Sequence, residues 1–166
     1  MMQQVKEDEP VEFEIRRDDL SSAQTRDLLA IHMSGMQAAS PAGSVCALNL
    51  TGLQAADITV WTAWRHGDVA CVGALRMLSP RHAEIKSMRA HPRFRGVGAG
   101  AALLDHLLDT ARGYGVLKVS LETGSGPDFE PALRLYRSRG FSEGEAFGDY
   151  EKSAFNQFLH RDLKSG

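Results

Sequence analysis

The sequence has few of the features that mark several classes of protein. Its 166 residues include only two cysteines, Cys46 and Cys71, and these have no CxxC or metal-ligand spacing. Apolar runs stay well below the roughly 20 residues that span a bilayer. The 19 basic and 21 acidic side chains give a formal net charge of −2, so nothing attracts the chain to nucleic acid or to an anionic membrane in general. We therefore expect no metal site, no membrane segment and no nucleic-acid partner.

The composition is otherwise that of an ordinary globular protein. Apolar residues make up 43% of the chain and charged residues 24%, and the length suits one domain. The segment 1–10 is polar and acidic, which is typical of a frayed tail and not of a secretory signal. We expect a disordered tail over 1–10, a single domain over 11–166 and a cytoplasmic location. The two cysteines lie among apolar neighbours and are predicted to be buried small hydrophobes.

Hydrophobic periodicity predicts a mixture of strands and helices. In chain order, the pattern indicates a strand over 11–16, a helix over 22–39, three strands over 58–65, 69–78 and 82–91, a helix over 98–112, a strand over 117–122, a helix over 129–139 and strand character around 155–159. The three consecutive strands suit an antiparallel meander, and the strand–helix–strand unit over 82–122 suits a right-handed parallel crossover. The segment 41–56 is left open as a loop or a short helix. The sequence thus predicts an α/β fold with a mixed sheet.

A basic, glycine-rich turn precedes the helix over 98–112. Gly96, Gly98 and Gly100 have no Cβ, so the backbone there can adopt a positive φ and let a ligand approach closely. The first turn of the helix has unpaired N–H groups and the positive end of the helix dipole. Arg93 and Arg95 add cationic donors. Together these features predict a site for a diphosphate.

Three known kinds of phosphate-binding turn can be compared with this one. The Walker P-loop is excluded because no Gly-Lys-Ser/Thr follows. Gly96-x-Gly98-x-x-Ala101 satisfies a relaxed dinucleotide-binding fingerprint, but that fold needs its first glycine at the end of a buried parallel strand, and Pro92 with its arginine neighbours intervenes. The third pattern is Arg95-x-x-Gly98-x-Gly100. It resembles the R/Q-x-x-G-x-G/A pyrophosphate loop of the GCN5-related N-acetyltransferases (GNAT).

A second motif supports the same resemblance. The segment 132–141 is similar to the A-x-x-L-Y-x-x-x-G-F helix of that family, and the order of predicted elements is the family's order. The segments 84–88 and 121–126 resemble a bacterial subgroup of small-molecule GNAT enzymes. The resemblance implies a GNAT fold, with a twisted, mostly antiparallel mixed sheet of about six to seven strands and about four helices.

The resemblance also implies acetyl-CoA as the acyl donor and assigns residues to it. The loop formed by Arg95 and Gly96 to Ala101 would surround the pyrophosphate, with main-chain N–H groups of Val97, Gly98, Gly100 and Ala101 as donors. The main chain of Met88 and Ala90 would pair with the pantetheine arm like an added strand, and the Met88 N–H would polarise the thioester carbonyl. Family members often have an asparagine where this chain has Phe129, so Phe129 or Thr123 is expected to contact pantetheine instead.

Three side chains are candidates for chemistry or acceptor binding, and each has a structural alternative. Tyr136 matches the family's general acid for the departing CoA thiolate, but a tyrosine on an apolar helix also packs well. Glu84 is either a general base for an ammonium acceptor or the ion-pair partner of Lys86. Lys86 suits an acceptor carboxylate, or a nearby glutamate such as Glu122. Strand periodicity places Glu84, Lys86 and Met88 on one face.

Two further residues are expected to face the acceptor. Glu122, at the end of its strand, either anchors a cationic amine or pairs with Lys86. His32 lies on the apolar face of the first helix, which borders the acceptor cleft in the GNAT fold, although a histidine there is also compatible with the core.

These observations together predict an N-acetyltransferase. It would move acetyl from acetyl-CoA to a primary amine of a small molecule, such as one that resembles an amino acid. Direct attack in a ternary complex is expected, because neither motif contains a cysteine to serve as an acyl-enzyme nucleophile. A non-catalytic acyl-CoA sensor and, more remotely, a dinucleotide-binding domain are the alternatives. A homodimer is compatible with the sequence, and no metal is required by the chemistry.

Overall fold

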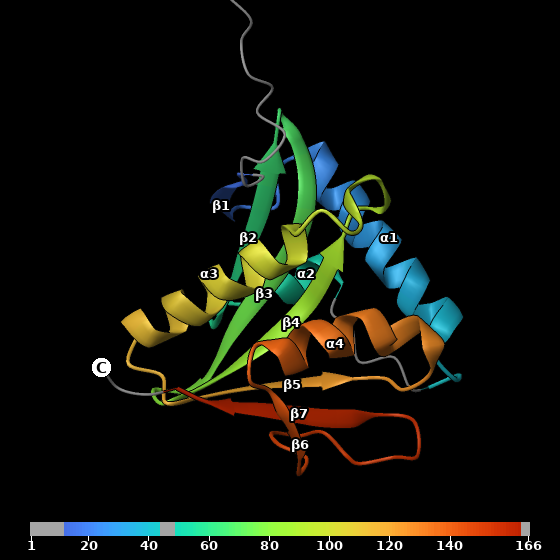
Figure 1. Cartoon of the computed structure of the whole chain (residues 1–166), viewed down its shortest axis with the longest axis vertical. Helices are drawn as coiled ribbons and strands as arrows, with labels where there is room; N and C mark the ends of the chain where they lie inside the picture. The colour runs from blue at the N-terminus through green and yellow to red at the C-terminus, as the bar shows by residue number, and fades with distance from the viewer. Residues whose placement is uncertain (1–11, 44–48, 164–166) are drawn as a thin grey trace, which may run out of the picture.

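Seven strands form one sheet in the computed structural model, which describes residues 12–43 and 49–163 (Figure 1). The strands are β1 (Glu14–Asp18), β2 (Ile58–Arg65), β3 (Asp68–Ser79), β4 (His82–Ala90), β5 (Lys118–Thr123), β6 (Ser142–Gly144) and β7 (Gln157–Asp162). Their order across the sheet is β1-β2-β3-β4-β5-β7-β6. Only the central pair, β4 and β5, is parallel, so the sheet is mixed and mostly antiparallel as predicted.

Helices cover both faces of the sheet (Figure 1). They are α1 (Ala23–Ala39), α2 (Leu50–Leu53), α3 (Ala99–Gly113) and α4 (Glu130–Ser138), with 3₁₀ turns η1 (Pro92–Phe94) and η2 (Pro127–Phe129). The apolar stripe of α3, whose leucines are at most 2% exposed, packs with α4 on one face, whereas Leu28 of α1 and Leu53 of α2 pack on the other. The sheet, including the ends of β4 and β5, therefore lies between two layers of helices. No helix of the described residues is long and apolar enough to cross a membrane.

Most of the predicted elements are confirmed, with a few differences in detail. The helix predicted over 129–139 begins as η2 and continues as α4, because Pro127 and Pro131 restrict the backbone at its start. The segment left open, 41–56, contains α2, with Asn49 as its N-cap. Strand β6 was not predicted, since its three residues are exposed and show no alternation. The predicted tail over 1–10, Val11 and Cys46 lie outside the described residues.

A bulge in β4 overturns one expectation about side-chain direction. Val72 of β3 pairs with Arg89 and Ala74 pairs with Lys86, so two residues of β4 lie opposite the single residue Gly73. Ser87 adopts a φ of 57° there, and strand alternation is interrupted. The Met88 side chain consequently packs against Gly73 and the leucines of α3, on the face opposite to Glu84 and Lys86. The prediction that all three share one face was wrong for Met88.

The same stretch of β4 separates from β5. The parallel pairing covers only three positions, from His82 opposite Lys118 to Glu84 opposite Ser120. Beyond Glu84, no described strand pairs with the β5 side of β4. An unpaired strand edge presents main-chain donors and acceptors to an extended ligand. The fold thus exposes a strand edge that leads directly to η1 and the glycine-rich turn.

Candidate active site

The glycine-rich turn forms the N-terminus of α3. Gly96 and Gly98 adopt φ values of 75° and 90°, and a Cβ at either position would meet no atom within 4 Å. Gly98 is the N-cap of α3 and provides no side-chain cap for its first N–H groups. Gly96, Val97 and Arg95 are exposed beside these N–H groups. The turn therefore offers open space, unpaired donors and positive charge in one place, which is what a diphosphate requires.

Tyr136 lies in the interior at the α4 side of the sheet. Its ring packs against Phe141 with 5.8 Å between the ring centroids, and the side chain is only 7% exposed. Burial raises the pKa of the Tyr136 phenol well above its usual range, the neighbouring Cys71 acts in the same direction, and the charge of Arg89 opposes them. The phenol therefore keeps its proton at physiological pH, which a general acid must do.

Glu84 and Lys86 belong to a buried cluster of three polar side chains. The Lys86 Nζ lies 3.2 Å from a Glu84 carboxylate oxygen, with the two side chains 7% and 2% exposed. The third member is Tyr150, from the segment after β6, whose hydroxyl donates a 2.5 Å hydrogen bond to the same oxygen and also contacts Lys86 Nζ. Paired and hydrogen-bonded charges tolerate burial, which explains how this carboxylate persists in the interior.

Glu122 lies on the same face of the sheet as this cluster. Its neighbours Leu121 and Val119 pack into the α3 side of the core, so Glu122 and Ser120 face the other way. Ser120 is the parallel partner of Glu84. The sheet therefore brings Glu122, Glu84 and Lys86 to one face, as the predicted acceptor site requires.

His32 and Arg89 form a pair on the α1 side. The Arg89 Nε donates a 3.0 Å hydrogen bond to His32 Nδ1. His32 is 7% exposed, and burial together with the Arg89 charge lowers its pKa to about 4, so the ring is neutral at physiological pH. Burial, together with the charge of Arg95, lowers the pKa of Arg89, although the guanidinium remains charged at physiological pH. His32 is thus an interior residue with a specific partner that was not predicted.

Thr123 and Phe129 lie at the end of β5 and the start of α4. Thr123 is 9% exposed and Phe129 is 7% exposed. The Phe129 ring packs on Phe155, with 5.5 Å between the ring centroids, and against the backbone of Gly124, where a Cβ would lie 2.7 Å from the ring. The structure therefore places Phe129 in the core beside the separation of β4 and β5.

Two further observations concern Cys71 and the side chains that could bind a metal. Burial raises the pKa of the Cys71 thiol to about 12, so it stays protonated and unreactive, in agreement with its predicted role as a small hydrophobe. Among the described residues, no group of three histidine, cysteine, aspartate or glutamate side chains gathers as metal ligands would.

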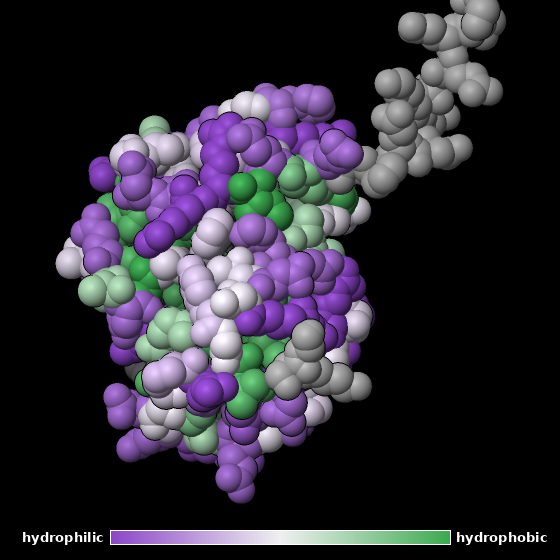
Figure 2. All heavy atoms as spheres, turned by 90° about the vertical axis from the view of Figure 1, so that its left-hand side faces the viewer, coloured by the Kyte–Doolittle hydropathy of each residue, from purple (hydrophilic) through white to green (hydrophobic). Residues whose placement is uncertain are grey.

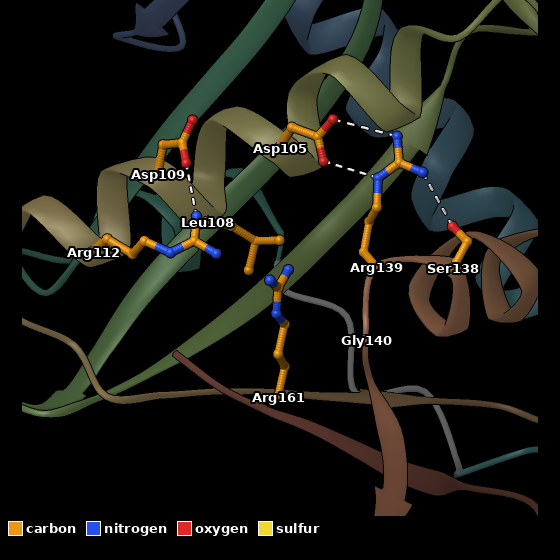
Figure 3. Close-up of a pocket in the computed structure, with 8 residues that line it drawn as sticks. All are labelled: Asp105, Leu108, Asp109, Arg112, Ser138, Arg139, Gly140 and Arg161. Carbon is orange, nitrogen blue, oxygen red and sulfur yellow. Dashed lines mark hydrogen bonds and ion pairs between the residues drawn. The ribbon is translucent and has the colours of Figure 1, made fainter. Parts of the chain in front are cut away.

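One groove of the described surface lies away from these residues. It has a volume of about 610 Å³ and lies between α3, the end of α4 and β7 (Figure 3). Arg139 forms two hydrogen bonds to Asp105, and Arg161 points toward α3 (Figure 3). The residues of the glycine-rich turn do not line this groove. The face shown in Figure 2 is mostly hydrophilic, with hydrophobic residues in small separate groups. The homodimer stays a prediction.

Comparisons with known proteins agree with this geometry. The family model described as acetyltransferase (GNAT) family matches residues 21–141. This chain is a member of the GNAT acetyltransferase family. It is 40% identical to the uncharacterized N-acetyltransferase YsnE from Bacillus subtilis, over 90% of this chain and 99% of that protein. It is 33% identical to an IAA acetyltransferase from Azospirillum brasilense, over 74% of this chain and 80% of that protein.

A solved acetyltransferase structure shows the same fold. The Bacillus subtilis acetyltransferase in complex with CoA superposes with a TM-score of 0.69 at 19% identity, covering 92% of this chain and all of that one. The predicted GNAT fold is therefore confirmed, as is the prediction that the chain is an acetyltransferase. The predicted residues occupy two groups, one at the glycine-rich turn and α4 and one on the opposite face of β4 and β5.

Sequence reasoning missed three residues of this region. Tyr150 follows a Gly-Asp pair in an irregular segment, where no motif or periodicity singles out a tyrosine. Ser87 lies at the bulge, and its buried hydroxyl has no hydrogen-bond partner within the described part of the chain. Arg89 follows Met88 directly, and its direction depends on that bulge. A strand pattern without the bulge would assign Arg89 to the wrong face.

Proposed function

We propose that this GNAT enzyme transfers acetyl from acetyl-CoA to a primary amine of a small molecule, by direct attack in a ternary complex. The observation that carries the proposal is the continuity of the unpaired β4 edge with the glycine-rich turn. Pairing with β5 ends at Glu84, and the exposed edge leads through Met88 and Ala90 to the N-terminus of α3. A ligand with a pantetheine arm and a diphosphate fits this continuity.

In this proposal the donor lies along β4. Main-chain groups of Met88 and Ala90 pair with the pantetheine arm, and the Met88 N–H stabilises the negative charge that develops on the thioester oxygen. Main-chain N–H groups of Val97, Gly98, Gly100 and Ala101, with the Arg95 side chain and the close approach that Gly96 permits, bind the diphosphate. Thr123 and Phe129 border the arm from the β5 side.

The acceptor amine arrives as an ammonium and must lose a proton before attack. Glu84 accepts that proton, directly or through water, and Lys86, Tyr150 and Glu122 define its surroundings. Attack of the amine nitrogen on the thioester carbon forms the new C–N bond, and collapse of the tetrahedral intermediate breaks the C–S bond. Tyr136 donates a proton to the departing thiolate, since its phenol is protonated at physiological pH.

The small-molecule acceptor is supported by the relatives. The Azospirillum brasilense protein is named for acetylation of IAA.

The competing function is that of an acyl-CoA sensor, which needs neither a base nor an acid. A direct test mixes the full chain with acetyl-CoA and a panel of amino acids, polyamines and simple amines, and follows free thiol and acetylated product. Thiol release that depends on an amine supports transfer, and acetyl-CoA binding without transfer to any amine supports the sensor.

A further inference from the structure

Arg89 is a half-buried cation, and no carboxylate in the described part of the chain forms an ion pair with it. The Arg89 Nε donates a hydrogen bond to the neutral His32 ring, and the positive charge of Arg95 acts on the guanidinium. An unpaired charge that has lost part of its hydration is costly, and a ligand anion removes that cost. We infer that Arg89 binds a carboxylate of the acceptor, so that the substrates are amines that also carry a carboxylate.

The bulge places Arg89 on the acceptor side of the sheet. Arg89 pairs with Val72 and Lys86 pairs with Ala74, and both β3 residues pack into the cluster that includes α1. The side chains of Arg89 and Lys86 therefore lie on the same face. The main chain of Met88, the proposed donor contact, lies between them. A carboxylate at Arg89 and an amine directed toward Glu84 would thus bracket the thioester.

The guanidinium is held in place, and its terminal N–H groups form no hydrogen bond with a residue of 12–43 or 49–163. Nε is used by His32 Nδ1, and the two terminal nitrogens lie against α1 at Gly35, where a Cβ would be 3.0 Å from one of them. A side chain at position 35 would displace the Arg89 guanidinium. The terminal N–H groups have the planar geometry that binds a carboxylate in a bidentate way. His32 is therefore a positioning residue for Arg89.

The nearby phenol connects this subsite with the reaction centre. Arg89 and Tyr136 interact electrostatically, since each affects the pKa of the other. Arg89 also directly follows Met88, whose main chain is the proposed contact of the thioester. The competing assignment is that Arg89 binds a CoA phosphate together with Arg95, and the experiment separates the two.

The inference rests on the proposed function, and matched acceptors test it. Steady-state kinetics compare amino acids with their carboxamides and with the corresponding amines that lack the carboxylate. The wild type should prefer the acids. Arg89→Gln should raise KM for the acids by roughly 10- to 100-fold, the range expected for a lost charge-assisted hydrogen bond, and should change KM for the neutral amines and for acetyl-CoA less than about twofold. Arg89→Lys should recover only part of the preference.

The positioning role has its own variants. His32→Asn retains an acceptor near the position of Nδ1 and should keep the preference for acids. His32→Leu removes the acceptor and should weaken that preference by raising KM for the acids more than KM for the neutral amines. A binding measurement does not depend on turnover. An acid, and not its carboxamide, should raise the melting temperature of the CoA-saturated wild type, and neither should do so for Arg89→Gln.

Three results would overturn the inference. Preference of the wild type for amines without a carboxylate contradicts it and leaves the proposed transfer intact. A rise in KM for acetyl-CoA in Arg89→Gln, with acceptor preference unchanged, assigns Arg89 to the donor. Acetyl-CoA binding without transfer to any amine contradicts the proposed function itself and this inference with it.

Discussion

The hydroxyl of Tyr150 donates a 2.5 Å hydrogen bond to the buried carboxylate of Glu84 and so ties the segment after β6 to strand β4. The two residues are 66 positions apart in the sequence. Lys86 contacts both, and its Nζ lies 5.1 Å from the centre of the Tyr150 ring. The proposed base therefore belongs to a network whose geometry is set by a loop that the sequence motifs do not include.

Glu84→Gln tests whether this carboxylate is a base. A glutamine has nearly the same shape but cannot take the proton from an ammonium, so turnover at neutral pH should fall by about 10²–10⁴-fold. The dependence of rate on pH should also change. Tyr150→Phe is the matched control, because it keeps the carboxylate and removes only the hydrogen bond. It should cost less than about tenfold in rate. If Glu84→Gln lowers the melting temperature and leaves the pH profile alone, Glu84 is only the ion-pair partner of Lys86.

Gly98→Asp tests the diphosphate site. The added Cβ meets open space but must adopt a φ of 90°, and the carboxylate would face the diphosphate with a like charge. Gly98→Asn has nearly the same shape, tolerates a positive φ better than most residues and lacks the charge. By isothermal titration calorimetry, the aspartate variant should bind acetyl-CoA at least about tenfold more weakly than the asparagine variant, equivalent to about 1.4 kcal/mol. Equal affinities in the two variants would place the diphosphate elsewhere.

Tyr136→Phe tests the general acid. The substitution removes the hydroxyl and keeps the ring that packs on Phe141, so folding and acetyl-CoA binding should persist while kcat falls by about 10²-fold or more. Phe141→Leu is the control for packing, since it disturbs the same ring contact and leaves the hydroxyl. It should lower the melting temperature more than the rate. Unchanged kcat in Tyr136→Phe would leave Tyr136 with a packing role only.

The burial of His32 predicts a pH dependence of stability. Its pKa is lowered to about 4 in the folded state, against about 6.5 in the unfolded chain, so only the unfolded chain takes up this proton between those values. The free energy of unfolding should therefore decrease as pH falls from 6.5 to 4, by about 3 kcal/mol from this residue. Urea titrations at both pH values check the prediction. In His32→Asn the free energy of unfolding should decrease less over the same pH range. An equal decrease in the variant and the wild type would assign the pH dependence to other groups.

The sequence predicted the sheet and the backbone of the glycine-rich turn well, because local patterns encode them. The strand over 58–65 was predicted with its observed bounds, and the helix predicted over 98–112 was found as Ala99–Gly113, since alternation and the leucine stripe are properties of neighbouring residues. The positive φ at Gly96 and Gly98 agrees with the role expected for those glycines.

The acceptor side depends on contacts that no local pattern contains. The bulge at Ser87 and Met88 interrupts alternation, so a strand pattern gave the wrong face to Met88 and offered no reason to consider Arg89. Tyr150 reaches Glu84 through chain topology alone. His32 was assigned to the acceptor cleft, but its partner Arg89 appears only when α1 packs on β4. His32 and Arg89 are 57 positions apart, and a single sequence read by itself gives no signal for such a pair.

Acetyl transfer to an amine can be measured through both of its products in one reaction. The full chain is incubated with acetyl-CoA and the amine panel, and mass spectrometry follows the acetylated acceptor while a thiol reagent follows free CoA. We expect equal amounts of N-acetylated amine and released CoA, and loss of both in Tyr136→Phe with acetyl-CoA binding retained. Tight acetyl-CoA binding with no acetylated amine from any member of the panel would contradict it.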